Sequence, residues 1–266
     1  MGKDNYFCRM KINSLQFIPV TDSTNKALAQ LVSDNKLKNN SLSDFFGLYT
    51  DYQISGRGEG QNKWQSNRGE NILLSLYFIP PLPPSQQFVF NRFFSLTVRK
   101  TLANYIPGVK IKWPNDIYVN DKKIAGILIE HSISGDTMAG TIAGVGININ
   151  QTQFDPLLPN PTSLKLETGS QYDVISLIHE MIDNGEKIYY PQLINKQYDL
   201  LKEEYLEHLY LINEMHWYDI RGTKTEASII GTNDFGQLLL EDRQGIIYTC
   251  GTKEVRFMLF DNDVEG

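Results

Sequence analysis

The chain has 266 residues, of which 41% are hydrophobic and 21% are charged, and its formal net charge is −6. This length predicts one large domain, or one domain with a smaller second one, in an ordinary soluble globular protein. The negative charge argues against broad nucleic-acid binding, and no apolar run is long enough to suggest a transmembrane helix. Because the N-terminus also lacks the apolar segment of a secretory signal, we expect a cytoplasmic protein.

The sequence offers no metal site built from cysteine or histidine. Its two cysteines, Cys8 and Cys250, lie far apart and lack the spacing of metal ligands. The four histidines do not cluster either. We therefore expect two idle or buried thiols in a reducing cytoplasm.

The first half of the chain alternates between short apolar runs and helical patterns. Side chains that favour helix N-caps occupy positions 21–25, and apolar residues at helical spacing follow them, so a helix is expected to begin near Thr24. In chain order, the pattern predicts strands over 15–20, 47–54 and 72–79, and then a long amphipathic helix over 87–106. The aromatic residues of that helix are expected to lie in the core.

The second half begins with strands that follow one another directly. Strands are predicted over 109–113, 117–120, 124–130 and 138–149, and this meander favours an α+β fold over a doubly wound sheet. A mainly helical stretch follows over 173–211, with a break expected at Tyr190-Pro191. From Ile220, short strands between turn residues suit a small β-barrel of about five strands. We therefore divide the chain into residues 1–215 and a C-terminal β domain, residues 216–266.

A glycine-rich stretch, QISGRGEGQNKW at 53–64, is the central feature of the sequence. Its three glycines within 56–60 permit positive φ angles and close approach to a ligand, and backbone N–H groups can form an anion-binding concavity there. Arg57 between two glycines suits phosphate or carboxylate, and Trp64 can stack on a flat ring. The alternative is an ordinary surface turn, since the spacing matches neither G-x-G-x-x-G nor the P-loop.

Three groups of polar residues fall on turns beside apolar strands, where ligand-binding side chains collect. They are Ser23-Thr24-Asn25, Gln53 with Arg57, and the segment KWPND at 112–116 with Lys123. The neutral side chains suit a polar ring that carries donors and acceptors, and the two cations suit an anionic end.

Each group also has a structural alternative. Ser23 and Thr24 can act as helix caps, the Pro-Asn-Asp sequence is a good turn, and Lys123 can sit on a solvated hairpin tip. Asp116 suits Mg²⁺, which is usually bound by one or two carboxylates together with phosphates. No Ser/His/Asp or Cys/His set is visible, which points to catalysis by positioning and charge stabilisation, as in phosphoryl or nucleotidyl transfer.

Together these motifs resemble the biotin–protein ligase family, the biotin–[acetyl-CoA-carboxylase] ligases. The resemblance is carried by DSTNKAL (22–28), QISGRGEGQNKWQSNRGEN (53–71), KWPNDIYVNDKKIAGILIE (112–130), GVGININ (144–150) and PTSL (161–164), in family order. It implies a mixed, mainly antiparallel sheet packed with helices, as in biotin/lipoate ligases and class II synthetases, followed by an SH3-like β domain.

The resemblance also implies a two-step reaction. Biotin and ATP give biotinyl-5′-AMP and pyrophosphate with Mg²⁺ as cofactor, and a lysine of a biotin carboxyl carrier domain then displaces AMP. Arg57 and Lys123 match the family's catalytic positions. Positions that match biotin contacts are Ser23, Thr24, Asn25, Gln53, Gly56, Arg57, Gly58, Glu59, Lys123 and Gly126. Positions that match nucleotide contacts are Arg57, Trp64, Lys112, Asn115, Asp116 and Asn148, and Asp116 also matches a metal position.

The chain departs from the family pattern in two places. Glu59 stands where many relatives carry a second arginine, and Lys63 could compensate for the lost cation. The ligase motifs begin close to the N-terminus, so we expect no winged-helix domain and no DNA binding. Members of the family often dimerise through the sheet, so a homodimer is an expectation that the resemblance carries.

Three other functions remain open at this point. A lipoate–protein ligase has a related fold and similar adenylate chemistry, but the Gln53 to Gly58 loop resembles the biotin branch. A biotin-sensing regulator would need the DNA-binding domain that the chain is expected to lack. A plain carrier-binding module would not need Arg57, Asp116 and Lys123.

Overall fold

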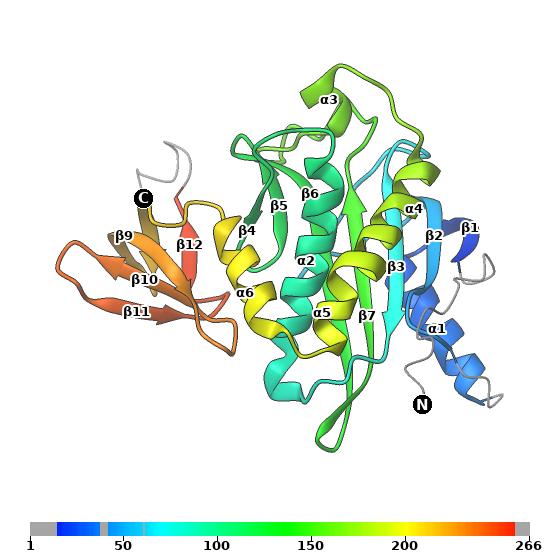
Figure 1. Ribbon diagram of the computed structural model, residues 1–266. Coiled ribbons are helices and arrows are strands. Elements are labelled where there is room, and N and C mark those ends of the chain that lie inside the picture. Colours follow the sequence, from blue (N-terminus) through cyan, green and yellow to red (C-terminus); the bar gives the residue numbers. More distant parts are fainter. Residues whose placement is uncertain (1–14, 38–41, 61, 259–266) are drawn as a thin grey trace.

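A seven-stranded sheet and a five-stranded sheet organise the protein (Figure 1). The computed structural model describes residues 15–37, 42–60 and 62–258. The larger sheet has the strand order β1-β2-β3-β7-β6-β5-β4, in which β1 runs parallel to β2 and the other neighbours are antiparallel. Its strands are β1 (Leu15–Thr21), β2 (Phe46–Gln53), β3 (Ile72–Phe78), β4 (Lys110–Lys112), β5 (Asp116–Val119), β6 (Lys122–Ser134) and β7 (Thr137–Ile147). The expected mixed, mainly antiparallel sheet is confirmed.

Helices cover the two faces of this sheet unequally (Figure 1). The N-terminal helix α1 packs on β2 and β3 through a small cluster of its own, whereas the long α2 and the later helices bury the main core on the opposite face. The helical segments are α1 (Thr24–Leu37), η2 (Pro84–Gln86), α2 (Gln87–Ala103), α3 (Leu164–Thr168), α4 (Val174–Asn184), η3 (Gly185–Tyr189), α5 (Tyr190–Ile194) and α6 (Tyr198–Glu207). None of the described helices is long and apolar enough to span a membrane.

Alternation along β3 separates the two faces. Leu74, Leu76 and Phe78 belong to the main core, while Tyr77 packs in the cluster beneath α1. Because side chains alternate with a period of two, Ser75 projects to the same face as Tyr77. The face of the sheet that carries α1 therefore receives polar as well as apolar side chains.

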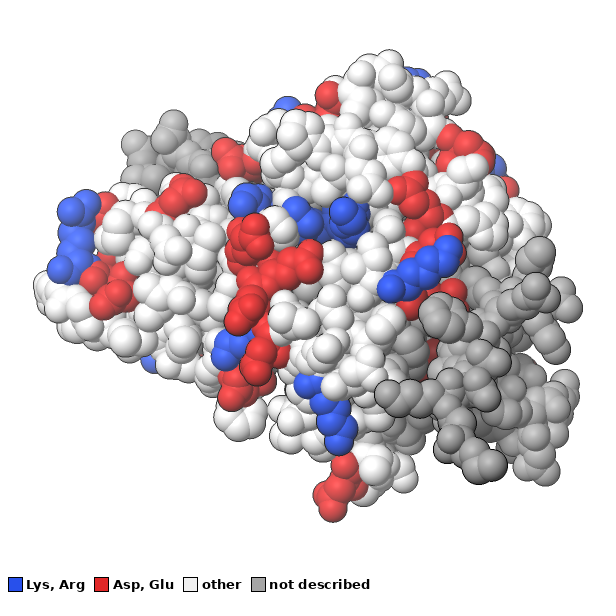
Figure 2. Space-filling model, in the orientation of Figure 1, with Lys and Arg blue, Asp and Glu red and all other residues white. Residues whose placement is uncertain are grey.

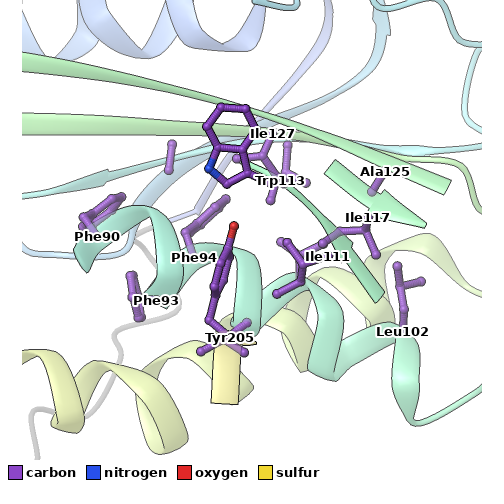
Figure 3. Close-up of a cluster of buried hydrophobic side chains, with 14 of the residues drawn as sticks. Phe90, Phe93, Phe94, Leu102, Ile111, Trp113, Ile117, Ala125, Ile127 and Tyr205 are labelled. Carbon is purple, nitrogen blue, oxygen red and sulfur yellow. The ribbon is translucent and has the colours of Figure 1, made fainter. Parts of the chain in front are cut away.

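The aromatic residues of α2 lie in the core, as the sequence predicts. Phe90, Phe93 and Phe94 are fully buried, and Figure 3 shows them beside Ile111, Trp113 and Tyr205. The helix ends at Ala103, three residues earlier than predicted, because in a continuing helix the ring of Pro107 would clash with the carbonyl of Ala103.

The helix break predicted at Tyr190-Pro191 is wrong. The chain remains helical from η3 into α5, where Pro191 occupies the first turn. Proline is tolerated there because the first N–H groups of a helix have no intrahelical partner. The break falls instead before α6, at Lys196, which has a φ of 56°.

The five-stranded sheet confirms the small β unit expected at the C-terminus. Its order is β11-β10-β9-β8-β12, and every pairing is antiparallel. The strands are β8 (Met215–Ile220), β9 (Thr223–Thr232), β10 (Leu238–Asp242), β11 (Ile247–Cys250) and β12 (Val255–Phe257). The domain division at residue 216 stays a prediction. Cys250 is buried and unpaired, whereas Cys8 and the expectations for the N-terminus lie outside the described residues.

Charges on the helical face are mixed. Figure 2 shows lysine and arginine side chains scattered among acidic ones on the face that α2, α5 and α6 cover, without a continuous basic stripe.

We predict that Phe93→Ala lowers the free energy of unfolding by about 3–5 kcal/mol, because it opens a cavity among fully packed rings. Phe93 is 0% exposed and contacts Phe45, Phe78 and Phe90 at ring-centroid distances of 6.5, 5.7 and 5.3 Å. Phe235→Ala is the matched control, since Phe235 is 70% exposed and its loss should change stability by less than about 0.5 kcal/mol. Urea denaturation measures both, and equal losses would contradict this description of the core.

Candidate active site

The glycine-rich loop folds back on itself over the sheet. Arg57 and Lys63 form an antiparallel bridge, the Gly58 N–H donates to Asn62 O at 2.8 Å, and the Trp64 N–H donates to Gly56 O at 3.0 Å. A Cβ on Gly56 would lie 2.3 Å from Trp64 O, so only glycine fits there. Of the three glycines only Gly60 has a positive φ, at 63°, so the first two allow close packing rather than an unusual backbone.

Trp64 lies flat against two glycines of the sheet. Gly126 of β6 and Gly146 of β7 are direct partners across the ladder. A Cβ on Gly146 would lie 2.3 Å from the indole, and one on Gly126 would lie 3.0 Å from it. The buried indole N–H has no hydrogen-bond partner among the described residues. The two glycines thus give the Trp64 ring space to pack against the sheet. The indole N–H of Trp64 is a buried donor beside the cavity.

Polar side chains from three elements meet beneath the loop. Gln53 Oε1 accepts from the Thr24 N–H at 2.8 Å, at the start of α1. The hydroxyl of Ser75 lies 2.7 Å from Thr24 Oγ1 and 2.6 Å from Asn25 Oδ1. A Cβ on Gly144, the ladder partner of Ser75, would lie 2.1 Å from Asn25 Oδ1. The N-terminus of α1 therefore rests directly on the sheet backbone, with its polar groups satisfied by β2 and β3.

Two ion pairs flank this polar group. Lys123 Nζ lies 2.6 Å from Asp116 Oδ2, and Arg57 Nη1 lies 3.2 Å from Glu130 Oε1. The side chains of these pairs are roughly one-third to two-fifths exposed, so each pair contributes only about 0–1 kcal/mol. Asn25 Nδ2 donates to the other oxygen of Glu130 at 2.7 Å, which connects the polar group to Arg57.

Lys123 is held in place by the backbone around it. Its N–H donates to Asn160 O at 2.8 Å, and its carbonyl accepts from the Thr162 N–H at 3.0 Å. At the preceding hairpin turn, Asp121 Oδ1 accepts from the Tyr210 hydroxyl at 2.6 Å. These contacts fix both ends of the short segment that carries the lysine.

A cavity of about 140 Å³ lies among these groups. Its wall is formed by residues of α1, the glycine-rich loop, the 114–116 turn, β6 and β7. These segments meet on one side of the sheet. The predicted site residues in its wall are Ser23, Thr24, Asn25, Gln53, Arg57, Gly58, Glu59, Trp64, Asn115, Asp116, Lys123 and Gly126. The other residues in the wall of this cavity are Asn62, Lys63, Pro114, Ile127, Leu128, Gly144, Val145 and Gly146.

A second cavity, of about 390 Å³, adjoins the first. The two share Glu59, Pro114, Asn115, Ile127 and Leu128 in their walls. The remaining wall of the second cavity comes from Trp113, from the start of α2, from β6 and from two turns of the C-terminal sheet. The 113–115 segment therefore separates the candidate site from the C-terminal sheet.

Three predicted site residues lie outside the wall of the first cavity. Gly56 packs inside the loop, against the Trp64 carbonyl and the Gln53 side chain. Lys112 points its ammonium group toward the rings of Tyr118 and Phe257, at 4.9 and 4.8 Å from their centroids. Burial and the nearby Asp116 raise the pKa of Tyr118 to about 12, so the phenol beside Lys112 stays neutral.

Asn148, the third of these residues, is buried below the 161–164 segment. Its Nδ2 donates to Thr162 O at 2.9 Å, while Oδ1 has no hydrogen-bond partner among the described residues. This oxygen is a buried acceptor without a partner in the described part of the chain, and Asn148 lines neither of the two cavities. The ligand roles of Asn148 and Lys112 remain predictions.

Ser75 and Glu130 are important members of the polar group that the sequence pattern did not indicate. Ser75 is fully buried between apolar neighbours in β3, and its polarity within ILLSLYFI was the only available signal. Glu130 follows IAGILI in β6 and carried no signal of its own.

The acidic groups give limited support for a metal ion. Over 15–37, 42–60 and 62–258, no three His, Cys, Asp or Glu side chains gather into a metal site. Asp116 lies in the cavity wall close to Lys123. A single carboxylate fits Mg²⁺ only if phosphates supply further oxygen ligands.

The chain is similar to known proteins over most of its length. Residues 17–148 match the model of the Biotin/lipoate A/B protein ligase family. The bifunctional ligase/repressor BirA of Bacillus subtilis is 31% identical over 219 residues, which cover 80% of this chain and 66% of BirA. The biotin–[acetyl-CoA-carboxylase] ligase of Paracoccus denitrificans is 30% identical over 160 residues, covering 58% of this chain and 63% of the ligase. The chain thus spans roughly two thirds of the length of these curated relatives.

Solved structures agree in fold over almost the whole chain. The biotin protein ligase of Aquifex aeolicus in complex with biotin and ATP has a TM-score of 0.71 at 24% identity, covering 91% of this chain and 98% of that one. The Leishmania major biotin protein ligase in complex with biotinyl-5-AMP has a TM-score of 0.61 at 19% identity, covering 92% of this chain and all of that one. With this fold and with these relatives, the chain belongs to the biotin protein ligase family.

Proposed function

We propose that this protein is an ATP-dependent biotin–protein ligase. It would attach biotin to a lysine of a biotin carboxyl carrier domain through biotinyl-5′-AMP. The observation that carries the proposal is the single cavity in which Arg57, Lys123 and Asp116 meet the polar group of α1, β2 and β3. The Aquifex relative binds biotin and ATP, and the Leishmania relative binds biotinyl-5-AMP.

The buried polar group suits the ring system of biotin. The ureido ring of biotin presents two N–H donors and one carbonyl acceptor, and amide and hydroxyl side chains can serve both. Thr24, Asn25 and Gln53 provide such groups and line the cavity. Glycines 144 and 146 line the cavity, and because they lack side chains Asn25 and Trp64 can pack against the sheet beside it.

The two cations suit the first chemical step. A carboxylate oxygen of biotin attacks the α-phosphorus of ATP, a P–O bond forms, and the bond to the pyrophosphate leaving group breaks. Arg57 and Lys123 would reduce the repulsion between the two anions and stabilise the charge that develops between them. Each is held by a partly exposed carboxylate in the free protein, so anionic oxygens of the ligands can replace those carboxylates.

Two further groups suit the nucleotide. Trp64 offers a flat ring and a buried N–H, and Asn148 offers a buried carbonyl oxygen that could accept from the amino group of adenine. Mg²⁺, when bound, would neutralise phosphate charge, and Asp116 is the carboxylate that we assign to hold it.

In the second step, the lysine amine of the carrier attacks the carbonyl carbon of the mixed anhydride. An amide bond forms, the amine loses a proton, and AMP leaves with the electron pair of the broken C–O bond. Lys123 and Arg57 would stabilise the departing phosphate.

Pyrophosphate exchange tests this function. Labelled pyrophosphate should enter ATP when biotin is supplied without any carrier, and no label should enter without an acid substrate. Exchange with lipoate but not with biotin would instead place the protein with the lipoate ligases. Absence of exchange with both acids would contradict adenylation by the free enzyme.

We predict that Lys123→Gln lowers the rate of pyrophosphate exchange by about 10²–10³, because a preorganised cation is lost at the developing charge. Lys122→Gln is the matched control. Lys122 is adjacent, its side chain is 54% exposed, and its Nζ is 3.9 Å from Glu167. Its replacement should leave the rate within about threefold. Equal rates in the two variants would contradict the role of Lys123.

Glu59→Arg should retain adenylate formation. Glu59 lines both cavities, and a guanidinium there would add positive charge near the phosphates. Glu59→Gln is the control that removes the negative charge without adding a positive one. Pyrophosphate exchange measures both variants, and a complete loss in Glu59→Arg with normal exchange in Glu59→Gln would show that an arginine is not accepted.

A further inference from the structure

A turn of the C-terminal sheet contacts the segment that carries Asp116. This turn joins β9 to β10 and comprises residues 232–237. The indole N–H of Trp113 donates to Gly236 O at 2.8 Å, and Trp113 is only 6% exposed. The residues that follow Trp113 are Pro114, Asn115 and Asp116, all of which line the candidate active site.

The 232–237 turn is fixed by its own hydrogen bonds. Asn233 Oδ1 accepts from the N–H groups of Phe235 and Gln237, at 3.1 and 3.0 Å. Gly236 has a φ of 83°, and a Cβ at that position would lie 2.2 Å from the ring of Phe88. Glycine therefore satisfies both the backbone conformation and the close contact, and its carbonyl has a defined direction.

Arg92 of α2 ties this turn to the helix. Its side chain is almost completely buried, and Nη2 donates to Thr232 Oγ1 at 3.1 Å and to Asn233 O at 3.2 Å. The guanidinium also lies 4.9 Å from the ring centroid of Phe88. A buried cation is tolerated only when its partners stay in place, so Arg92 restrains the position of the turn.

The 113–114 segment is restrained from a second direction. The fully buried Tyr205 of α6 donates its hydroxyl to Pro114 O at 2.9 Å. Figure 3 shows this hydroxyl pointing toward the ring of Trp113. Two hydrogen bonds, one from the side chain of Trp113 and one to the carbonyl of Pro114, thus restrain the segment that precedes Asn115 and Asp116.

We propose that Gly236 and Trp113 are positioning residues for adenylation. The 232–237 turn holds Trp113, and Trp113 sets the place of Asn115 and Asp116 opposite Lys123. The proposal rests on the proposed function. A displacement of about 1 Å near reacting groups can lower a rate about 10²-fold. The contacts that we assign to the biotin ring come from α1 and β2 and do not involve this turn, so biotin affinity should be independent of it.

Trp113→Phe tests this proposal, because it removes the N–H and keeps an aromatic ring. Pyrophosphate exchange should fall about tenfold to a hundredfold in kcat, while the Kd for biotin, measured by calorimetry, stays within about twofold. Trp217→Phe is the matched control. Trp217 is 43% exposed on β8, and its replacement should change neither quantity.

The outcomes separate the two proposals. Normal exchange in a folded Trp113→Phe variant, or an equal loss of exchange and of biotin binding, would overturn the positioning role alone. Absence of biotin-dependent exchange in the unaltered protein would overturn the proposed function, and this proposal with it. If Trp113→Phe does not fold, Tyr205→Phe probes the same segment through Pro114. The Tyr205→Phe variant should also lower kcat and leave the Kd for biotin unchanged. An unchanged kcat in this variant would overturn the proposal.

Discussion

The absence of side chains at Gly126 of β6 and at Gly144 and Gly146 of β7 is the constraint on which the site depends. A Cβ on Gly144 would collide with Asn25, and a Cβ on Gly146 would collide with Trp64. Glycine normally weakens a strand, but these two lie in the middle of the sheet, where neighbouring strands supply the ladder bonds on both sides. The N-terminus of α1 and the glycine-rich loop can therefore reach the backbone of the sheet. The cavity is the space that remains between them.

The positive charges of Arg57 and Lys123 are balanced by carboxylates that the anionic groups of a ligand could replace. Arg57 and Lys123 each contact a carboxylate, and both pairs are partly open to solvent. Such pairs contribute little to stability, so little free energy opposes their replacement by a carboxylate or a phosphate. Glu130 also accepts from Asn25, so this carboxylate would keep a partner if Arg57 turned to a ligand. The polar group that would hold the ring and the cation that would meet the anionic end are thus linked by one side chain.

Local patterns predicted most of the fold and much of the site. Strand alternation, the capping residues before α1 and the turn residues after β4 act over a few positions, so the sequence shows them directly. A residue whose role depends on a distant contact was missed, and one local signal was misinterpreted. Ser75 acquires its role from residues about 50 positions away, at the start of α1. The break expected at Pro191 was wrong because proline in a first turn is compatible with a helix.

The contact between Trp113 and Gly236 shows why the two sheets cannot be treated as independent units. It joins residues 123 positions apart, and no periodicity in either segment indicates it. Arg92 and Tyr205 strengthen the same junction from two different helices, and both are buried there. A contact that only attached the C-terminal sheet could be made anywhere on the surface. These hydrogen bonds involve Trp113 and Pro114, next to the candidate site. Because they fall on the residues immediately before Asn115 and Asp116, the C-terminal sheet forms part of the framework that holds these two residues in place.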